Sequence, residues 1–133
     1  MKNNNFTKVF LTLTIAALFA IGSACSNYGT RLEFNGGELY YTQNVTEPDA
    51  KKLGDYLVKE GMFNGTPKTI QLDKSGSTYQ VRMVIQAGKE NDKDILDGMK
   101  IYAADISKNV FANAATEMHL CDDTLKTLKV VKP

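Results

Sequence analysis

Apolar and polar residues alternate along three separate parts of the chain, and this period of two predicts β-strands. In the first part, Leu32 and Phe34 alternate with charged residues and precede Asn35-Gly36, a dipeptide that favours the positive φ angles of a tight hairpin turn. The second part, residues 68–86, shows the alternation on both sides of a Lys-Ser-Gly-Ser turn. The third surrounds Asp122-Asp123. We therefore predict three β-hairpins.

Helical periodicity occupies the two segments between these hairpins. Thr46 is a suitable N-cap for the first helix, Pro48 fits its first turn because the N–H there needs no helical partner, and Gly61 fits a left-handed C-terminal stop. Asn91 and Asp92 are cap candidates for the second helix. Apolar residues recur every three or four positions in both segments: Ala50, Leu53, Tyr56 and Leu57 in the first, and Ile95, Met99, Tyr102, Ala103, Ile106 and Val110 in the second.

The later part of the pattern resembles the earlier part. Residues 62–72 match residues 110–120 at a constant offset, so that each predicted helix leads through an aromatic residue into a similar strand. The element order is ββαββαββ. We predict an α+β fold, a two-layer sandwich in which both helices cover one face of an antiparallel sheet made of the three hairpins. The pattern does not specify the strand order.

A short apolar segment precedes the domain. Lys2 and Lys8 supply positive charge at its start, and residues 9–21 are mostly apolar. The apolar run is shorter than the roughly 20 residues that a membrane-spanning helix needs. This arrangement is typical of an export signal that is removed from the mature protein.

The segment ends in Ile21-Gly22-Ser23-Ala24-Cys25, which resembles the lipobox of bacterial lipoproteins. The resemblance implies that Cys25 receives a diacylglyceryl group and that the peptide is cut before it. Gly22 stands where stricter lipoboxes carry a leucine or a similar residue. An ordinary secretory signal cut after Ala24, or an uncleaved anchor, are the alternatives.

A lipobox would divide the chain into a signal peptide over 1–24, a lipidated tether over 25–30 and a single domain over 31–133. The lipid chains on Cys25 would hold this domain at a membrane. We expect a bacterial cell-envelope location, at the outer membrane and facing the periplasm. The reason for preferring the outer membrane is Ser26, which stands in place of the aspartate associated with inner-membrane retention in some bacteria.

Charge and cysteine content argue against several classes of protein. The chain has 16 basic and 15 acidic residues, and loss of Lys2 and Lys8 would leave no basic excess for a nucleic acid. Lipidation of Cys25 would leave Cys121 without a cysteine partner. The chain has a single histidine and no recognised spacing of metal ligands, which argues against a metal site. It also lacks the glycine-rich loop that would indicate a nucleotide-binding site. We expect neither a metal nor another cofactor.

The densest group of reactive side chains is Glu117-Met118-His119-Leu120-Cys121. Strand alternation would place Glu117, His119 and Cys121 on one face, where a histidine could lower the pKa of the thiol and activate it. Residues two apart on a strand have Cα atoms about 6.5–7 Å apart, so direct contact would need favourable rotamers. A thiol-dependent enzyme or redox sensor that uses Cys121 with His119 is therefore the alternative hypothesis, and a polar pair without catalysis is favoured.

The sheet face turned away from the helices is the favoured binding surface. It would carry Tyr40, Arg82 and Val84, and tyrosine and arginine are enriched among interface anchors. A solvated polar face explains any single one of these residues more simply. However, a domain without a catalytic set must act through some surface. We predict that Tyr40, Arg82 and Val84 contact a protein partner. The other residues on this face would be Thr42, Gln71, Gln80, His119 and Thr127.

Residues 34–131 resemble an uncharacterised domain of bacterial envelope and membrane proteins, chiefly through the segments GGELYYT (36–42), KTIQLD (68–73) and HLCDD (119–123). This resemblance implies an envelope setting and no particular activity. The sequence therefore favours a lipid-anchored, non-catalytic binding or adaptor module that contacts an envelope protein. A thiol-dependent enzyme and a structural subunit of an envelope complex are the alternatives.

Overall fold

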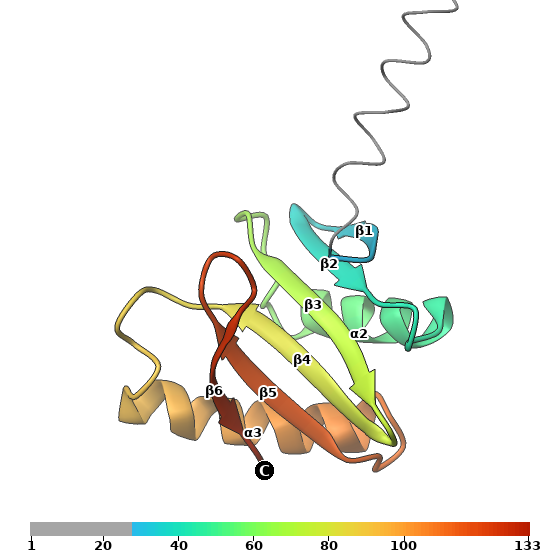
Figure 1. The fold of residues 1–133 in the computed structure, drawn as a ribbon. Helices are drawn as coiled ribbons and strands as arrows, with labels where there is room; N and C mark the ends of the chain where they lie inside the picture. Colours follow the sequence, from blue (N-terminus) through green and yellow to red (C-terminus); the bar gives the residue numbers. More distant parts are fainter. Residues whose placement is uncertain (1–27) are drawn as a thin grey trace, which may run out of the picture.

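The computed structural model describes residues 28–133, and Cys25, the predicted signal peptide and the start of the predicted tether lie outside this range. Eight elements follow one another in the order predicted from the sequence (Figure 1). The α+β class and the element order are therefore confirmed. The elements are β1 (Thr30–Phe34), β2 (Gly37–Tyr41), α2 (Glu47–Lys59), β3 (Thr69–Ser75), β4 (Thr78–Val84), α3 (Lys93–Asn109), β5 (Thr116–Cys121) and β6 (Thr127–Val131).

The six strands form one sheet in the order β1-β2-β3-β4-β5-β6. The three predicted hairpins are present as the antiparallel pairs β1–β2, β3–β4 and β5–β6. The prediction of an antiparallel sheet is wrong where a helix joins neighbouring strands, because β2 runs parallel to β3 and β4 runs parallel to β5. A helix returns the chain to the end of the sheet where the preceding strand began, so the next strand runs in the same direction. The sheet is therefore mixed.

The two helix crossovers have opposite hands. Strands β2 and β3 run opposite to β4 and β5, whereas both crossovers advance across the sheet in the same direction. Both helices also lie on the same face of the sheet (Figure 1). Two crossovers of the same handedness could not satisfy both conditions. One of the two crossovers is therefore left-handed, which is rare for a connection between parallel strands.

The core lies between the sheet and the two helices. Leu72, Val81 and Met118 are neighbours across β3, β4 and β5, and all three are buried. The Tyr56 hydroxyl of α2 donates a hydrogen bond to the Asp105 carboxylate of α3, which joins the helices to each other. The helices contribute buried apolar residues to the same core: Ala50, Leu53 and Leu57 from α2, and Ala103 and Ile106 from α3.

An aromatic residue after each helix closes one end of the core. Phe63 packs directly on Gly37, where even a Cβ atom would lie 2.2 Å from the Phe63 ring. Phe111 stacks on Tyr79 with 3.8 Å between the ring centroids. The repeat detected in the sequence therefore corresponds to two similar packing units.

The helix ends follow the predicted capping. The Thr46 hydroxyl accepts a hydrogen bond from the backbone N–H of Asp49, and the Asp92 carboxylate accepts from the N–H groups of residues 94 and 95. Gly61 adopts a φ angle of 77°, the left-handed conformation predicted for the stop after the first helix. Local sequence thus sets both ends of α2 and the start of α3.

Candidate binding groove on the open sheet face

The sheet face away from the helices carries one continuous row of polar side chains. Tyr40, Gln71, Arg82 and His119 are neighbours across β2, β3, β4 and β5. Val84 lies two residues after Arg82 on the same strand and therefore on the same face. The structure thus places all three predicted contact residues, Tyr40, Arg82 and Val84, on one face, which we call the open face.

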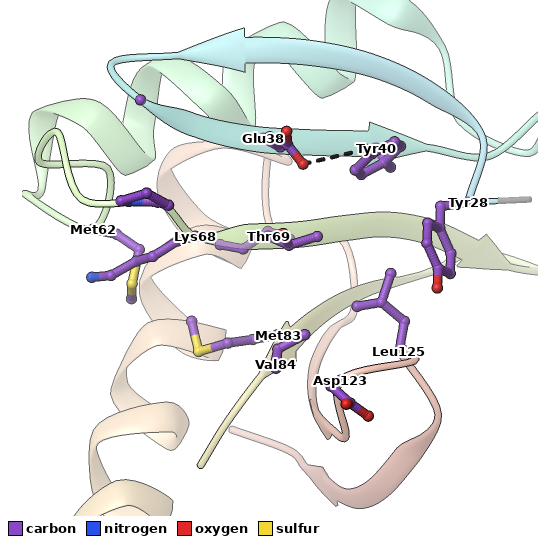
Figure 2. Close-up of a pocket in the computed structure, with 13 residues that line it drawn as sticks. Tyr28, Glu38, Tyr40, Met62, Lys68, Thr69, Met83, Val84, Asp123 and Leu125 are labelled. Atoms are coloured by element: carbon purple, nitrogen blue, oxygen red, sulfur yellow. Dashed lines mark hydrogen bonds between the residues drawn. The ribbon is translucent and has the colours of Figure 1, made fainter. Parts of the chain in front are cut away.

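A groove of about 610 Å³ lies at one end of the open face, where β2, β3 and β4 come together (Figure 2). Tyr40 and Val84 line it, and Arg82 does not. Several of the other lining residues are apolar or aromatic: Tyr28, Met62, Pro67, Met83 and Leu125, with the buried core residue Ile70 beneath them. Glu38, Lys68 and Asp123 add charged groups. An apolar groove with a few charged groups is the usual form of a binding site for a small ligand or a peptide side chain.

The turn between β5 and β6 places Leu125 in this groove. Asp122 Oδ1 accepts hydrogen bonds from the backbone N–H of Thr124 at 2.9 Å and of Lys126 at 3.0 Å. It also accepts one from the Thr124 hydroxyl, and these bonds hold the pKa of the Asp122 carboxyl below its ordinary value. Leu125 has a φ angle of 63°, unusual for a branched side chain, and is only 6% exposed. The turn is therefore ordered around a leucine that packs against the sheet.

Tyr28 closes another side of the groove. Its backbone carbonyl accepts a hydrogen bond from Gln71 Nε2 at 2.8 Å, and its ring meets the ring of Tyr40 edge-on at 5.7 Å between centroids. Gly29 allows this path, because a Cβ atom there would lie 2.2 Å from the Tyr41 carbonyl oxygen. The predicted tether over 25–30 is thus too long at its C-terminal end. Tyr28 is packed on the sheet, and β1 begins at Thr30.

Arg82 has a different environment from Tyr40 and Val84. Its Nη1 donates to the Thr127 hydroxyl at 3.0 Å, and its Nη2 donates to Gln80 Oε1 at 3.3 Å. Its Nε is buried without a hydrogen-bond partner among residues 28–133. The guanidinium therefore links β4 to β6, which indicates a structural role for Arg82.

His119 belongs to the same polar network. Its Nδ1 lies 3.0 Å from the Thr127 hydroxyl, and its Nε2 lies 3.1 Å from Glu117 Oε2. Because an ionised carboxylate can only accept, Nε2 is the donor to Glu117. The Thr127 hydroxyl, which accepts from Arg82, can then donate to Nδ1. We call the four residues Arg82, Thr127, His119 and Glu117 the polar clamp.

Cys121 does not form the activated pair considered from the sequence. The residue is 0% exposed, and burial raises the pKa of its thiol. Its Sγ lies 3.4 Å from the His119 backbone carbonyl and 3.9 Å from the Thr127 hydroxyl, whereas the His119 ring contacts Thr127 and Glu117. A buried protonated thiol without a neighbouring base is a poor nucleophile.

No three histidine, cysteine or acidic residues gather to form a metal site within the part of the chain that the structure describes. Over the same residues, 28–133, neither helix has the length and apolar character needed to cross a bilayer.

Sequence reasoning identified Tyr40 and Val84 but missed Tyr28 and Leu125. Leu125 did carry a signal, because it is the single apolar residue in the turn Asp-Asp-Thr-Leu-Lys. Tyr28 carried none, since its contacts depend on how the chain crosses β2 and β3. Met62 follows Gly61 at the end of the first helix, and the structure places it in the groove.

The comparisons with known proteins give one match. No curated protein and no solved structure is detectably similar to the chain. The family AF_1994_N, described as a family N-terminal domain, matches residues 31–133, which include every strand and helix apart from the first residue of β1. The chain therefore belongs to the AF_1994_N domain family.

Proposed function

We propose that this protein is a lipid-anchored, non-catalytic binding module of the cell envelope, and that its groove holds an apolar segment of a protein partner at the membrane surface. The observation that carries the proposal is the lining of the groove. Aromatic and apolar side chains from four separate parts of the chain, including Tyr28, Met62, Val84 and Leu125, converge on one hollow. Such convergent apolar side chains are typical of the pockets that receive interface anchors.

The charged groups at the groove support binding rather than catalysis. Glu38 Oε2 accepts a hydrogen bond from the Tyr40 hydroxyl at 3.3 Å, and Glu38 Oε1 lies 2.6 Å from Arg31. These contacts hold Glu38 in place, and neither a histidine nor a cysteine lines the groove. The groove therefore combines an apolar floor with fixed polar groups, an arrangement that favours recognition.

The position of Tyr28 favours a partner at the membrane. Cys25 precedes Tyr28 by three residues, so their Cα atoms can be at most about 11 Å apart. If Cys25 carries the lipid, the groove lies close to the bilayer surface, on the periplasmic side of an outer membrane. A membrane protein or another lipid-anchored protein could reach it there.

The test is site-specific crosslinking of the full chain in its native envelope. A photoreactive phenylalanine analogue at Tyr40 should form a crosslink to one protein. The same analogue at Val58, an exposed residue of α2, should not. The second substitution Val84→Glu, which places a charge in the groove, should abolish the Tyr40 crosslink, and Val58→Glu should leave it intact. A Tyr40 crosslink that survives Val84→Glu would contradict binding in the groove.

Lipid attachment has its own test. Radiolabelled palmitate should be incorporated into the full chain, and Cys25→Ser should lose both the label and the membrane association. Cys121→Ser serves as the matched control, because its thiol is buried and should not affect incorporation. Retention of palmitate by Cys25→Ser would refute the anchor and leave the groove proposal to be judged by the crosslinks.

A further inference from the structure

Strand β6 is a free edge of the sheet. It pairs with β5 on one side, and no strand among residues 28–133 pairs with its other side. A free edge presents backbone N–H and C=O groups that another extended chain can pair with. Strand addition of this kind is a common way of binding a peptide.

Apolar side chains remain exposed on this edge. Leu128 is 44% exposed and Val130 is 42% exposed, and both belong to β6. Only two other large apolar residues in the described part of the chain are comparably exposed, and one of them is Ile101 of α3 at 71%. Two of the four exposed large apolar residues in the described part of the chain therefore lie on this single short strand.

A second hollow, of about 470 Å³, runs between α3 and β6. Leu96 of α3 and Val131 of β6 contribute apolar side chains to it, and Val130, which lies opposite His119 on the open face, borders it along the edge. A peptide strand added to β6 would direct alternate side chains toward this hollow, because successive side chains of a strand point to opposite faces. The hollow thus supplies the side-chain pocket that a bare edge lacks.

The charge around this hollow is strongly basic. Lys93, Lys100, Lys129 and Lys132 line it, and Asp97 is the single acidic lining residue. Asp97 is already paired with Lys93 at 2.6 Å. Lysines on an edge normally discourage pairing with another strand, but they would attract a strand that carries carboxylates. The positive charge around the hollow therefore favours an acidic extended segment over a basic one.

We propose that β6 and the hollow beside it bind an extended acidic segment of a partner protein by strand addition. The segment pairs its backbone with β6 and directs every second side chain into the hollow. Of these inward side chains, the apolar ones pack against Leu96 and Val131, and the carboxylates approach Lys100 and Lys129. This surface is separate from the groove at Tyr40, and the proposal holds whether or not Cys25 is lipidated.

The test uses the full chain in detergent micelles with a set of ten-residue peptides. Every second position carries, in turn, a glutamate and a valine, isoleucine or leucine, so that both kinds of side chain point to the face of the hollow, and threonine occupies the positions between. Hydrogen exchange should show new protection of the β6 amides when peptide binds, and no new protection of the β1 amides at the opposite edge. Lys129→Glu combined with Lys100→Glu should weaken binding at least about tenfold. Lys52→Glu on α2 is the matched control and should bind like the parent protein.

Three results would overturn the proposal. The first is that none of the acidic peptides binds, the second is protection that appears on β1 instead of β6, and the third is equal binding by the Lys100/Lys129 variant. Vesicles that contain an anionic phospholipid provide a further arm. If the lysine substitutions weaken vesicle binding but not peptide binding, the basic surface contacts lipid and not a peptide strand.

Discussion

The two β-α-β units of this protein have the same core and different open faces. In the first unit, β2–α2–β3, Leu39 lies beside Ile70; in the second, β4–α3–β5, Val81 lies beside Met118. The neighbouring pair on the open face is Tyr40 with Gln71 in the first unit. In the second unit the corresponding pair is Arg82 with His119. All four core residues are buried, so the helix side is nearly equivalent in the two units.

The open faces of the two units differ because their polar side chains have different hydrogen-bond partners. In the second unit, the polar clamp joins Arg82 and His119 to β6 through Thr127. In the first unit, Gln71 instead holds the Tyr28 carbonyl, and the hollow between Tyr28, Tyr40 and the sheet remains accessible. The same fold unit thus gives a hydrogen-bonded polar surface in one copy and an accessible groove in the other.

The largest expected effect is in the core that the two units share. Phe63→Ala should lower the free energy of unfolding by about 3–5 kcal/mol, because the ring is fully buried and packs on Gly37 without room for relaxation. Phe111→Ala should cost a similar amount. Urea unfolding followed by circular dichroism measures both. Val58→Ala, on an exposed position, should change stability by less than about 0.5 kcal/mol. A loss below about 1 kcal/mol in either phenylalanine variant would contradict the equivalence of the two units.

The polar clamp should give the next largest effect. Thr127→Val keeps the side-chain shape but removes the hydroxyl that Arg82 and His119 share. We expect a loss of about 1–3 kcal/mol, the usual cost of leaving buried polar groups unpaired. The same substitution at exposed Thr30 is the control and should have little effect. If Thr127→Val unfolds at the same urea concentration as the parent protein, the clamp is not structural.

A smaller difference should appear at alkaline pH. Burial and the hydrogen bond to Asp49 raise the pKa of Tyr79 to about 12, whereas Gly37 occupies the corresponding place in the first unit. The protonated phenol therefore contributes stability below pH 10, and this contribution is lost as pH rises from about 10 to about 12. Tyr79→Phe should flatten the fall in unfolding midpoint over this range. An unchanged pH profile would contradict the raised pKa of the buried Tyr79 phenol.

The smallest expected effect concerns Cys121, which corresponds to Asp73 of the first unit. Burial raises the pKa of its thiol, so iodoacetamide at neutral pH should modify it far more slowly than it modifies the same thiol in urea. Mass spectrometry of the folded full chain gives the rate. Rapid alkylation of the folded protein would revive the thiol-dependent alternative, which the environment of Cys121 otherwise disfavours.

The sequence was sufficient for the element order, the helix caps and the core positions, because each depends on neighbours within about one turn or one strand. It was insufficient for the parallel pairs, since alternation along a strand does not encode the direction of the next strand. A 13-residue helix between two hairpins could have indicated them, because a crossover of this kind usually joins parallel strands.

The candidate groove was predictable in part. Tyr40 and Val84 follow from the alternation that assigns one face of each strand. Arg82 has the same alternation, but its hydrogen bond to Thr127 depends on the register of β6, which no local pattern reveals. Tyr28 belongs to a segment that looks like a linker by composition, and it is held by a side chain 43 residues away along the chain.

The hydrogen bond between Gln71 and Tyr28 has a consequence for how the protein would meet its partner. It begins the folded domain two residues before β1, so a lipidated Cys25 would be joined to the domain by a link of about 11 Å at most. A link this short would restrict the domain to a thin layer above the lipid and limit its rotation. Encounters would then take place largely in two dimensions, where a short tether raises the effective concentration of any partner in the same membrane.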